Sequence, residues 1–170
     1  MASYRLTEIT VNLIIAHLKA NMPTALATLR TDRADSRVTT EPPTSYFIYP
    51  RAKGYRPPAV FVIAEETDFR LEETGPNFVN ATDIIHVAVL VEDKDRESLT
   101  IKAWRYQAAL AKLLNLTDLV SADTTVKCVT KILRNTFSPE YTNARDENAA
   151  DAVFRKEVVL ELEVEHYEKI

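Results

Sequence analysis

Glycine is scarce in this chain of 170 residues, which contains only Gly54 and Gly75. Loops that cradle phosphate groups need clustered glycines, because glycine lets several backbone amides approach a ligand closely. The scarcity therefore excludes a P-loop and a dinucleotide-binding fingerprint. A Gly-x-Ser-x-Gly nucleophile elbow is absent as well.

Cysteine is scarcer still, and Cys128 is the only one. A single thiol forms no internal disulfide, and we expect it to fill a small apolar space. The histidines His17, His86 and His166 fall on separate predicted elements without the spacing of paired metal ligands, and we expect His86 to be a hydrogen-bonded core residue. The sequence thus predicts no catalytic residue, metal site or cofactor, although the fold could still gather distant carboxylates.

Excess positive charge and long apolar runs are also missing. The 21 basic and 25 acidic residues give a net charge of -4, which offers no general attraction for nucleic acid or anionic lipid. The longest apolar stretch, Val11 to Ala16, is too short to span a bilayer, and Met1 to Leu6 does not resemble a signal peptide. We expect no membrane and no nucleic-acid readout, and folding in the cytoplasm.

What the chain does contain is a globular composition, with 46% hydrophobic and 27% charged residues. Its length favours a single domain over residues 1–170. A first helix is predicted from about Thr7, a candidate N-cap, and Pro23 should end or kink it before Thr24 to Arg33 resumes it. Residues on one side of this helix recur at steps of three and four, at Leu6, Ile9, Leu13 and His17. The apolar side is widened by Val11, Ile14, Ile15 and Leu18.

A second helix is predicted from a clearer pattern. Asp93 and Asp95 supply its N-terminal caps and complement its dipole. Its apolar face follows alternating steps of four and three, through Leu99, Ala103, Tyr106, Leu110 and Leu113.

Four strands are predicted, at Ala59 to Ala64, Val79 to Val91, Val126 to Leu133 and Phe154 to Tyr167. The last alternates strictly, with Val158, Leu160, Leu162 and Val164 on one face and Glu157, Glu161, Glu163 and Glu165 on a water-facing side. Unseparated strand pairs favour antiparallel neighbours. The predicted fold class is α+β, with a mainly antiparallel four-stranded sheet packed against two helices.

Long loops are predicted at residues 36–58, 66–78 and 136–152. The first contains five prolines, so a regular core element is not expected there. It is also aromatic and basic, which is typical of a contact surface or of a loop covering its own core. The candidate contact residues in it are Tyr46, Phe47, Tyr49, Arg51, Lys53, Tyr55 and Arg56. The acidic strand face of Glu161, Glu163 and Glu165 is a candidate complement by charge alone.

Taken together, the segments YFIYPRAKGYRPPAVFVI, DIIHVAVLVED, RESLTIKAWRYQAALAKLL and RKEVVLELEVEHYE resemble the tail terminator and related head-tail joining proteins of tailed bacteriophages. In that family a strand ending in an acidic residue leads to a helix with a Tyr-x-x-Ala-Leu-like core, matched here by Tyr106, Ala109 and Leu110. The resemblance spans nearly the whole chain and rests on element order and soft patterns. No contact residue of the family maps onto an individual position.

The resemblance implies a virion structural protein without enzymatic activity. Such a subunit closes into a ring, usually a hexamer, that caps the tail tube and faces the head connector or neck protein, with the tape measure protein as a further partner. A head-completion or connector adaptor and a tail-completion protein are close alternatives. Two other classes stay open: a small metal-dependent hydrolase, and a nucleic-acid or peptide-binding module that uses the aromatic loop.

Overall fold

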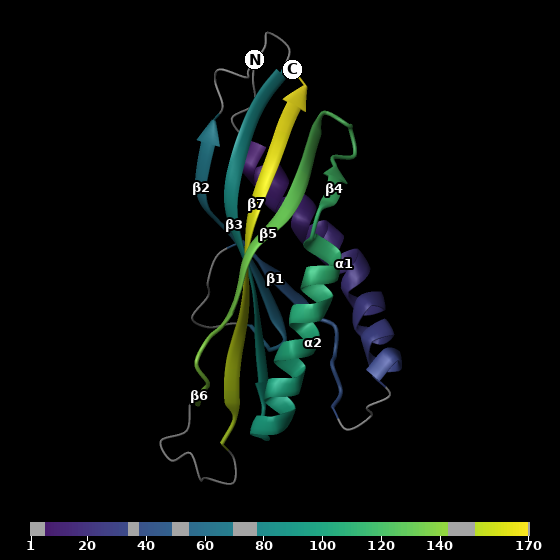
Figure 1. Ribbon diagram of the computed structural model, residues 1–170, viewed down its shortest axis with the longest axis vertical. Coiled ribbons are helices and arrows are strands. Elements are labelled where there is room, and N and C mark those ends of the chain that lie inside the picture. The colour runs from purple at the N-terminus through teal and green to yellow at the C-terminus, as the bar shows by residue number, and fades with distance from the viewer. Residues whose placement is uncertain (1–5, 34–37, 49–54, 70–77, 143–151, 170) are drawn as a thin grey trace.

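A computed structural model describes residues 6–33, 38–48, 55–69, 78–142 and 152–169, and the chain folds there into one sheet with both helices on a single face (Figure 1). The elements in chain order are α1 (Leu6–Arg33), β1 (Ser45–Phe47), β2 (Ala59–Phe69), β3 (Phe78–Asp93), α2 (Arg96–Leu114), β4 (Thr117–Val120), β5 (Val126–Phe137), β6 (Tyr141–Thr142) and β7 (Phe154–Lys169).

The centre of the sheet is the antiparallel pair of β3 and β7. Their register runs unbroken from Phe78 opposite Lys169 to Asp93 opposite Phe154. On the face toward the helices, which we call the helix face, both strands present buried aliphatic side chains, and the opposite, outer face of β7 carries the glutamates. The predicted alternation of β7 is therefore confirmed. The buried residues of this pair include Ile85, Val87, Val89, Val158, Leu160, Leu162 and Val164.

The sheet is larger than the four strands expected. Its order is β1-β2-β3-β7-β5-β4, with β6 also paired to β7, and the described strands are antiparallel except for β1 beside β2. The α+β class and the mainly antiparallel pairing are confirmed, whereas the strand count is corrected. The strands missed, β1, β4 and β6, span three, four and two residues, which is too short for an alternating pattern to be recognised.

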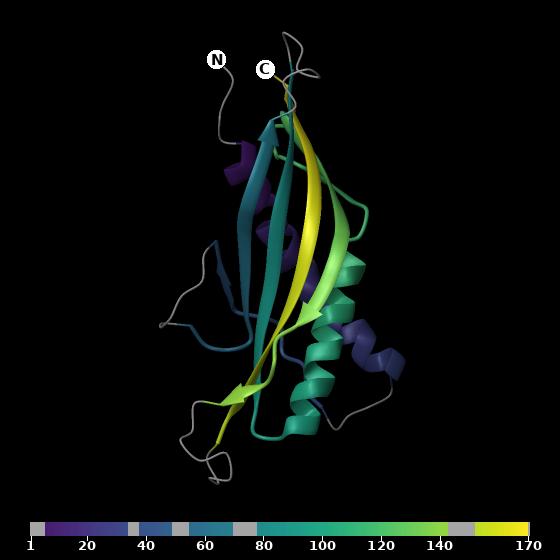
Figure 2. The same ribbon diagram turned by 60° about the vertical axis from the view of Figure 1, so that its left-hand side comes forward.

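Two β-bulges lie at one level of the sheet. The register shifts between Ala64 and Glu66 in β2, and between Ile132 and Arg134 in β5. One register row crosses four strands at this level: it contains Ala64 of β2, Ile85 of β3, Leu162 of β7 and Ile132 of β5. A bulge bends its strand and increases the local twist. The sheet is twisted, so its strands overlap at mid-height in the view of Figure 1 and lie side by side in that of Figure 2.

Helix α1 is one helix from Leu6 to Arg33, so of the two predicted effects of Pro23, an end or a kink, the end is wrong. The ring of Pro23 faces solvent, while Met22 and Leu26 on either side of it stay buried in the core. Continued packing across the proline stabilises the helix on both sides of the missing amide donor. Thr7 is not the N-cap either, because it lies inside α1 and its hydroxyl contacts Thr67 and Asp83.

Helix α2 follows its prediction closely. Asp95 is the N-cap, and its carboxylate accepts a hydrogen bond from the Ser98 amide at 2.7 Å. Asp93 accepts the Asp95 amide at 3.0 Å and pairs with Lys102 at 2.6 Å. The buried face is Leu99, Ala103, Arg105, Tyr106, Ala109, Leu110 and Leu114, so Arg105 joins it and the predicted Leu113 is only partly buried.

The predicted loops are shorter than expected. Residues 36–58 include β1 and the buried Val38, because α2 holds this segment: Arg105 donates to the Val38 carbonyl and Tyr106 to the Glu41 carbonyl. Residues 66–69 extend β2 and Phe78 begins β3. In the third loop, residues 136–137 end β5, and residues 141–142 form β6. The stretches 49–54, 70–77 and 143–151 lie outside the described residues.

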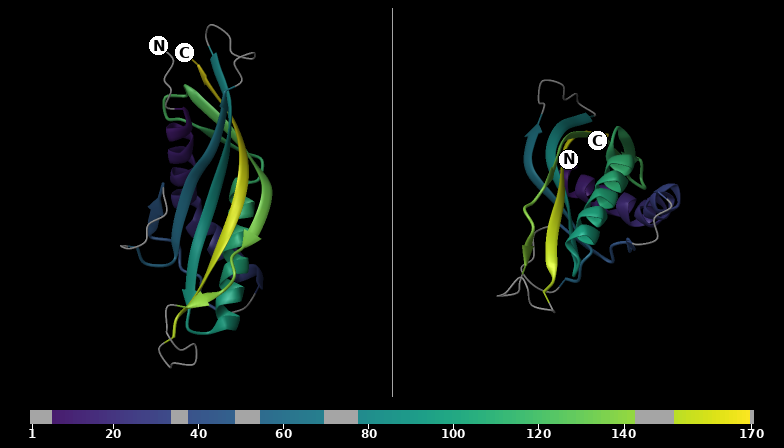
Figure 3. Two further views of the ribbon diagram at one scale, coloured as in Figure 1. Left: turned by 90° about the vertical axis from the view of Figure 1, so that its left-hand side faces the viewer. Right: turned by 60° about the horizontal axis from the view of Figure 1, so that its bottom comes forward.

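The helices pack on the sheet and on each other (Figure 3). Cys128 fills a position in the main core, as expected. Burial raises the pKa of its thiol to about 12, with the nearby carboxyls of Asp83 and Asp118 adding to the effect. Within the part of the chain that the structure describes, no helix combines the length and the apolar character needed to cross a bilayer.

Two neighbouring residues of β7 test which face of the sheet is buried against the helices. Leu160 is fully buried on the helix face, so Leu160→Ala should lower the free energy of unfolding by about 2–5 kcal/mol through lost burial and a cavity. Val159, half-buried on the outer face, is the matched control, and Val159→Ala should cost about 1 kcal/mol or less. Urea unfolding of both variants measures the difference, and equal losses would contradict the assigned faces.

Candidate interaction surface

The outer face of the sheet has an apolar end built by three aromatic rings. Phe47 stacks on Phe61 with centroids 5.5 Å apart, and Tyr55 meets the same ring edge-on at 5.4 Å. Phe61 lies with Ala59 and Leu90 in a small second core. The aromatic loop was open to two interpretations, and for Phe47 and Tyr55 the structure supports the one in which the loop covers its own domain.

The remaining candidate residues of that loop lie in different places. Tyr46 turns to the main core, where burial raises the pKa of its hydroxyl to about 12 and the Lys19 ammonium lies 5.4 Å from its ring centroid. Arg56 is exposed. Tyr49, Arg51 and Lys53 fall outside the described residues. Among the described members of the set, Tyr46 packs on the main core, whereas Phe47 and Tyr55 pack on the small second core, so these three do not share one surface.

Beyond the aromatic rings, the outer face carries a row of ionisable side chains at the level of the two bulges. His86 of β3 faces Glu161 of β7, which faces Arg134 of β5. Arg134 Nη2 lies 3.1 Å from Glu161 Oε2, and His86 Nε2 lies 3.9 Å from the same oxygen. His86 Nδ1 lies 3.5 Å from Glu65 Oε1 at the β2 bulge. His86 is thus partly exposed among carboxylates, which corrects its predicted core location.

A second ion pair extends this row, two residues further along β7 on the same face. Lys131 Nζ of β5 lies 3.0 Å from Glu163 Oε1 of β7. We call these six residues the charged row: Glu65, His86, Glu161, Arg134, Glu163 and Lys131. Two of the predicted acidic contact residues, Glu161 and Glu163, therefore already have cationic partners within their own sheet, while Glu165 is exposed. Sequence reasoning missed these pairs because they depend on strand register.

The charged row does not have the geometry of a metal site. The two carboxylates near His86 lie against opposite ring nitrogens, so they do not converge on one point with the imidazole. Among the residues described, no group of three or more metal-ligating side chains comes together. The row is a set of cross-strand ion pairs that stabilises the sheet.

Both edges of the sheet are only partly covered. On one side β1 pairs with Ala59–Phe61 of β2, and residues 62–69 continue beyond it. On the other side β4 pairs with residues 127–130 of β5, and residues 131–137 continue beyond it. No described strand pairs with the outer side of either continuation, and each carries an exposed large apolar residue, Phe69 at 38% and Leu133 at 44%.

A buried polar cluster connects α1 to the sheet. The Thr10 hydroxyl lies 2.7 Å from His166 Nδ1, and His166 Nε2 lies 3.5 Å from Asp83 Oδ2. Thr7 donates to Asp83 Oδ1 at 3.3 Å. The order of hydroxyl, imidazole and carboxyl resembles a nucleophilic triad. However, Thr10, His166 and Asp83 are all buried, so a substrate has no access to the hydroxyl, and the cluster positions α1 instead.

A cavity of about 220 Å³ lies between α2 and the segment that covers it, lined in part by Glu41, Glu92, Lys102 and Tyr106. Among its lining residues, Tyr106, Lys102 and Glu92 have partners within the fold. Burial is the largest cause that raises the pKa of Tyr106, which donates to the Glu41 carbonyl. Burial raises the pKa of Asp93, but hydrogen bonds from the Asp95 amide and from Lys102, whose ammonium lies 2.6 Å away, lower it below its ordinary value.

The His166 cluster makes a stability prediction. His166→Leu removes the partner of a buried carboxyl and should destabilise the fold by about 3 kcal/mol, because an unsatisfied buried polar group costs more than its lost bond. Asp83→Asn should lower the free energy of unfolding by less in the His166→Leu variant than in the parent protein. A double-mutant cycle by urea unfolding measures this coupling. Strictly additive losses would show that the two side chains do not interact.

Comparisons with known proteins give little further information. No protein-family model matches the chain. No curated protein matches it either. Among solved structures the chain is similar to one described as "Virion of native gene transfer agent (GTA) particle", with 17% identity, coverage of 96% of this chain and 99% of that chain, and a TM-score of 0.42. At that identity and TM-score, the similarity carries no argument about what this chain does.

Proposed function

We propose that this protein is a structural subunit of a phage-like virion, which works by forming contacts with copies of itself and with other virion proteins. The observation that carries the proposal is a pair of edge segments, residues 62–69 and 131–137, along which no strand of the described residues pairs on the outer side. Natural monomers shorten or cover their sheet edges, because an unpaired strand is a template for association. Two uncovered segments with exposed apolar residues suit a subunit that is completed by its neighbours.

Within that class, the sequence resemblance favours a tail terminator. Such a protein would form a ring, with a hexamer as the expected size, that caps the tail tube and presents its other face to the head connector or neck protein. The tape measure protein is a further candidate partner. A head-completion adaptor and a tail-completion protein would use similar subunit contacts. The proposal rests on this chain's edges and motifs and not on the solved gene transfer agent particle.

Ring formation places a simple demand on the subunit. A contact between two different patches leads to a closed ring or a filament, whereas one self-complementary patch stops at a dimer. This chain offers two different uncovered edges on opposite sides of one sheet. That arrangement suits the head-to-tail contacts of a ring.

The competing functions have less support from particular residues. For a metal-dependent hydrolase, the described carboxylates near His86 do not converge, and the Thr10 hydroxyl is buried. For a module that stacks nucleobases, the loop should present its aromatic rings to a ligand, but Phe47 stacks on Phe61 and Tyr55 contacts both rings within the domain's own small core. We therefore propose a non-enzymatic role.

The proposal predicts self-association. Light scattering of the purified protein at increasing concentration should give a mass several times that of the monomer, and electron microscopy of the same sample should show closed rings. If subunits close into a ring only on a tail tube, no rings form in the protein alone. Electron microscopy after purified tail tubes are added should then show extra density at the tube end. A monomer at high concentration that also leaves tube ends bare would contradict a tail terminator role.

The basic loop remains a proposed contact. Arg51→Glu combined with Arg56→Glu should weaken association if this loop meets the acidic face of Glu161 to Glu165 in another subunit. Because Arg56 is exposed, the change should leave the monomer folded, as circular dichroism would verify. Unchanged ring formation by the double variant would exclude this pairing while leaving the ring itself intact.

A further inference from the structure

The two uncovered edge segments carry opposite charge. Residues 62–69 of β2 contain three acidic side chains, Glu65, Glu66 and Asp68, and no basic one. Residues 131–137 of β5 contain two basic side chains, Lys131 and Arg134, and no acidic one. We call these segments the acidic edge and the basic edge.

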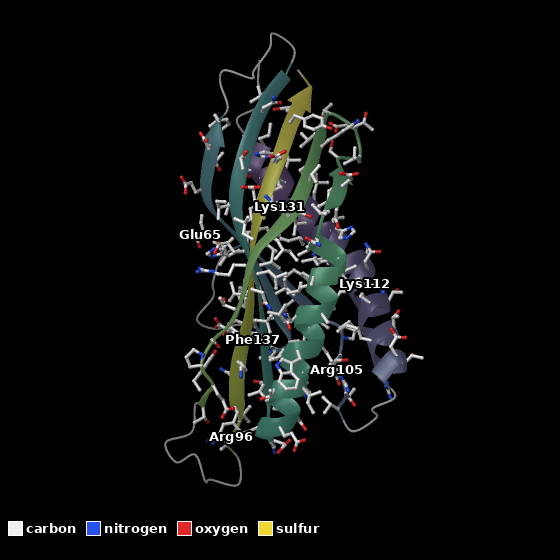
Figure 4. All side chains as sticks on the ribbon, in the orientation of Figure 1. Glu65, Arg96, Arg105, Lys112, Lys131 and Phe137 are labelled. Atoms are coloured by element: carbon white, nitrogen blue, oxygen red, sulfur yellow. The ribbon has the colours of Figure 1, made fainter. Side chains whose placement is uncertain are left out.

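These edges lie at the same level of the sheet. The bulge at Glu65 and the bulge at Leu133 flank one register row that crosses β2, β3, β7 and β5. Figure 4 labels Glu65 on the β2 side of the sheet and Lys131 on the β5 side, at a similar height. A neighbouring copy placed beside the sheet would therefore bring its acidic edge level with the basic edge of the first.

The charged groups at both edges reach solvent. The side chains of Glu65, Lys131 and Arg134 are 52%, 56% and 68% exposed. Lys131 and Arg134 pair with Glu163 and Glu161 on the outer face, but a guanidinium has five N–H donors and an ammonium three, so one pairing does not exhaust either group. Each retains donors for a carboxylate from another subunit.

We propose that the acidic edge of one copy docks on the basic edge of a second copy of this chain. This inference rests on the proposed function and names the surfaces that build its ring. Leu133, exposed between Lys131 and Arg134, supplies the apolar contact at the centre of the basic edge. The bulges interrupt a regular ladder at both edges, so side-chain charge, more than continued strand pairing, sets the register of the contact.

A second copy is the occupant that the charges favour. Each copy offers both signs at one level, so every docking event leaves one acidic and one basic edge free for the next subunit. A partner with charge of a single sign would bind only the edge of opposite charge and leave the other edge exposed. The contact is heterologous, as a ring requires.

Charge reversal tests the contact from each side. Glu65→Lys with Glu66→Lys makes the acidic edge basic, and Lys131→Glu with Arg134→Glu makes the basic edge acidic. Either double variant alone should associate at least about tenfold more weakly than the parent, because like charges then face each other. Lys112→Glu, at an exposed position of α2 away from both edges, is the control and should assemble as the parent does.

Mixing the two double variants makes the test specific. Equimolar mixing pairs each reversed edge with a complementary one, so assemblies of parent size should return, and native mass spectrometry should find both chains in them. Combining all four substitutions in one chain should restore association as well. Circular dichroism and thermal unfolding establish that each variant is folded.

The outcomes separate the two proposals. Recovery on mixing supports the edge contact. Folded double variants that assemble as well as the parent would overturn the edge contact and leave the ring proposal standing. Loss of assembly without recovery, either on mixing or in the fourfold variant, would also overturn it, since charge complementarity predicts rescue. A parent chain that stays monomeric even with tail tubes would overturn both.

Discussion

The structure depends on the antiparallel ladder between β3 and β7. Sixteen residues of each strand pair without interruption, so every position of one strand fixes the face and level of a position in the other. The apolar rows of both strands then fall on the helix face, where α1 and α2 bury them. A shift of one residue in either strand would move the glutamates of β7 into the core. The core therefore specifies the register.

The same register places the charges. Because Glu161 and Glu163 must lie on the outer face when Leu160 and Leu162 are buried, cations on β5 and His86 on β3 come within reach of them. The short strands β1 and β4 pair with only part of β2 and β5, so in the described part of the chain the rest of each edge strand has no outer partner, and these two segments carry opposite charge. We therefore infer that the strand register within the monomer determines how the next subunit can approach.

Long elements with complete patterns were predictable from sequence. The glutamates of β7 and the Asp95 cap of α2 are local signals, and both interpretations are confirmed. The charged row was not predictable, because residues such as His86 and Glu161 are far apart in sequence and meet through strand register alone. Helix α1 continues past Pro23 because packing on its buried side outweighs a local breaker signal.

The central claim is that subunits meet through the uncovered edges of the sheet. Hydrogen exchange of backbone amides, compared between assembled protein and monomers obtained by dilution, tests it most directly, since amides buried at a contact exchange more slowly. The account predicts added protection in residues 62–69 and 131–137 of the assembled form. Protection confined to other segments, with both edges exchanging as they do in the monomer, would contradict it.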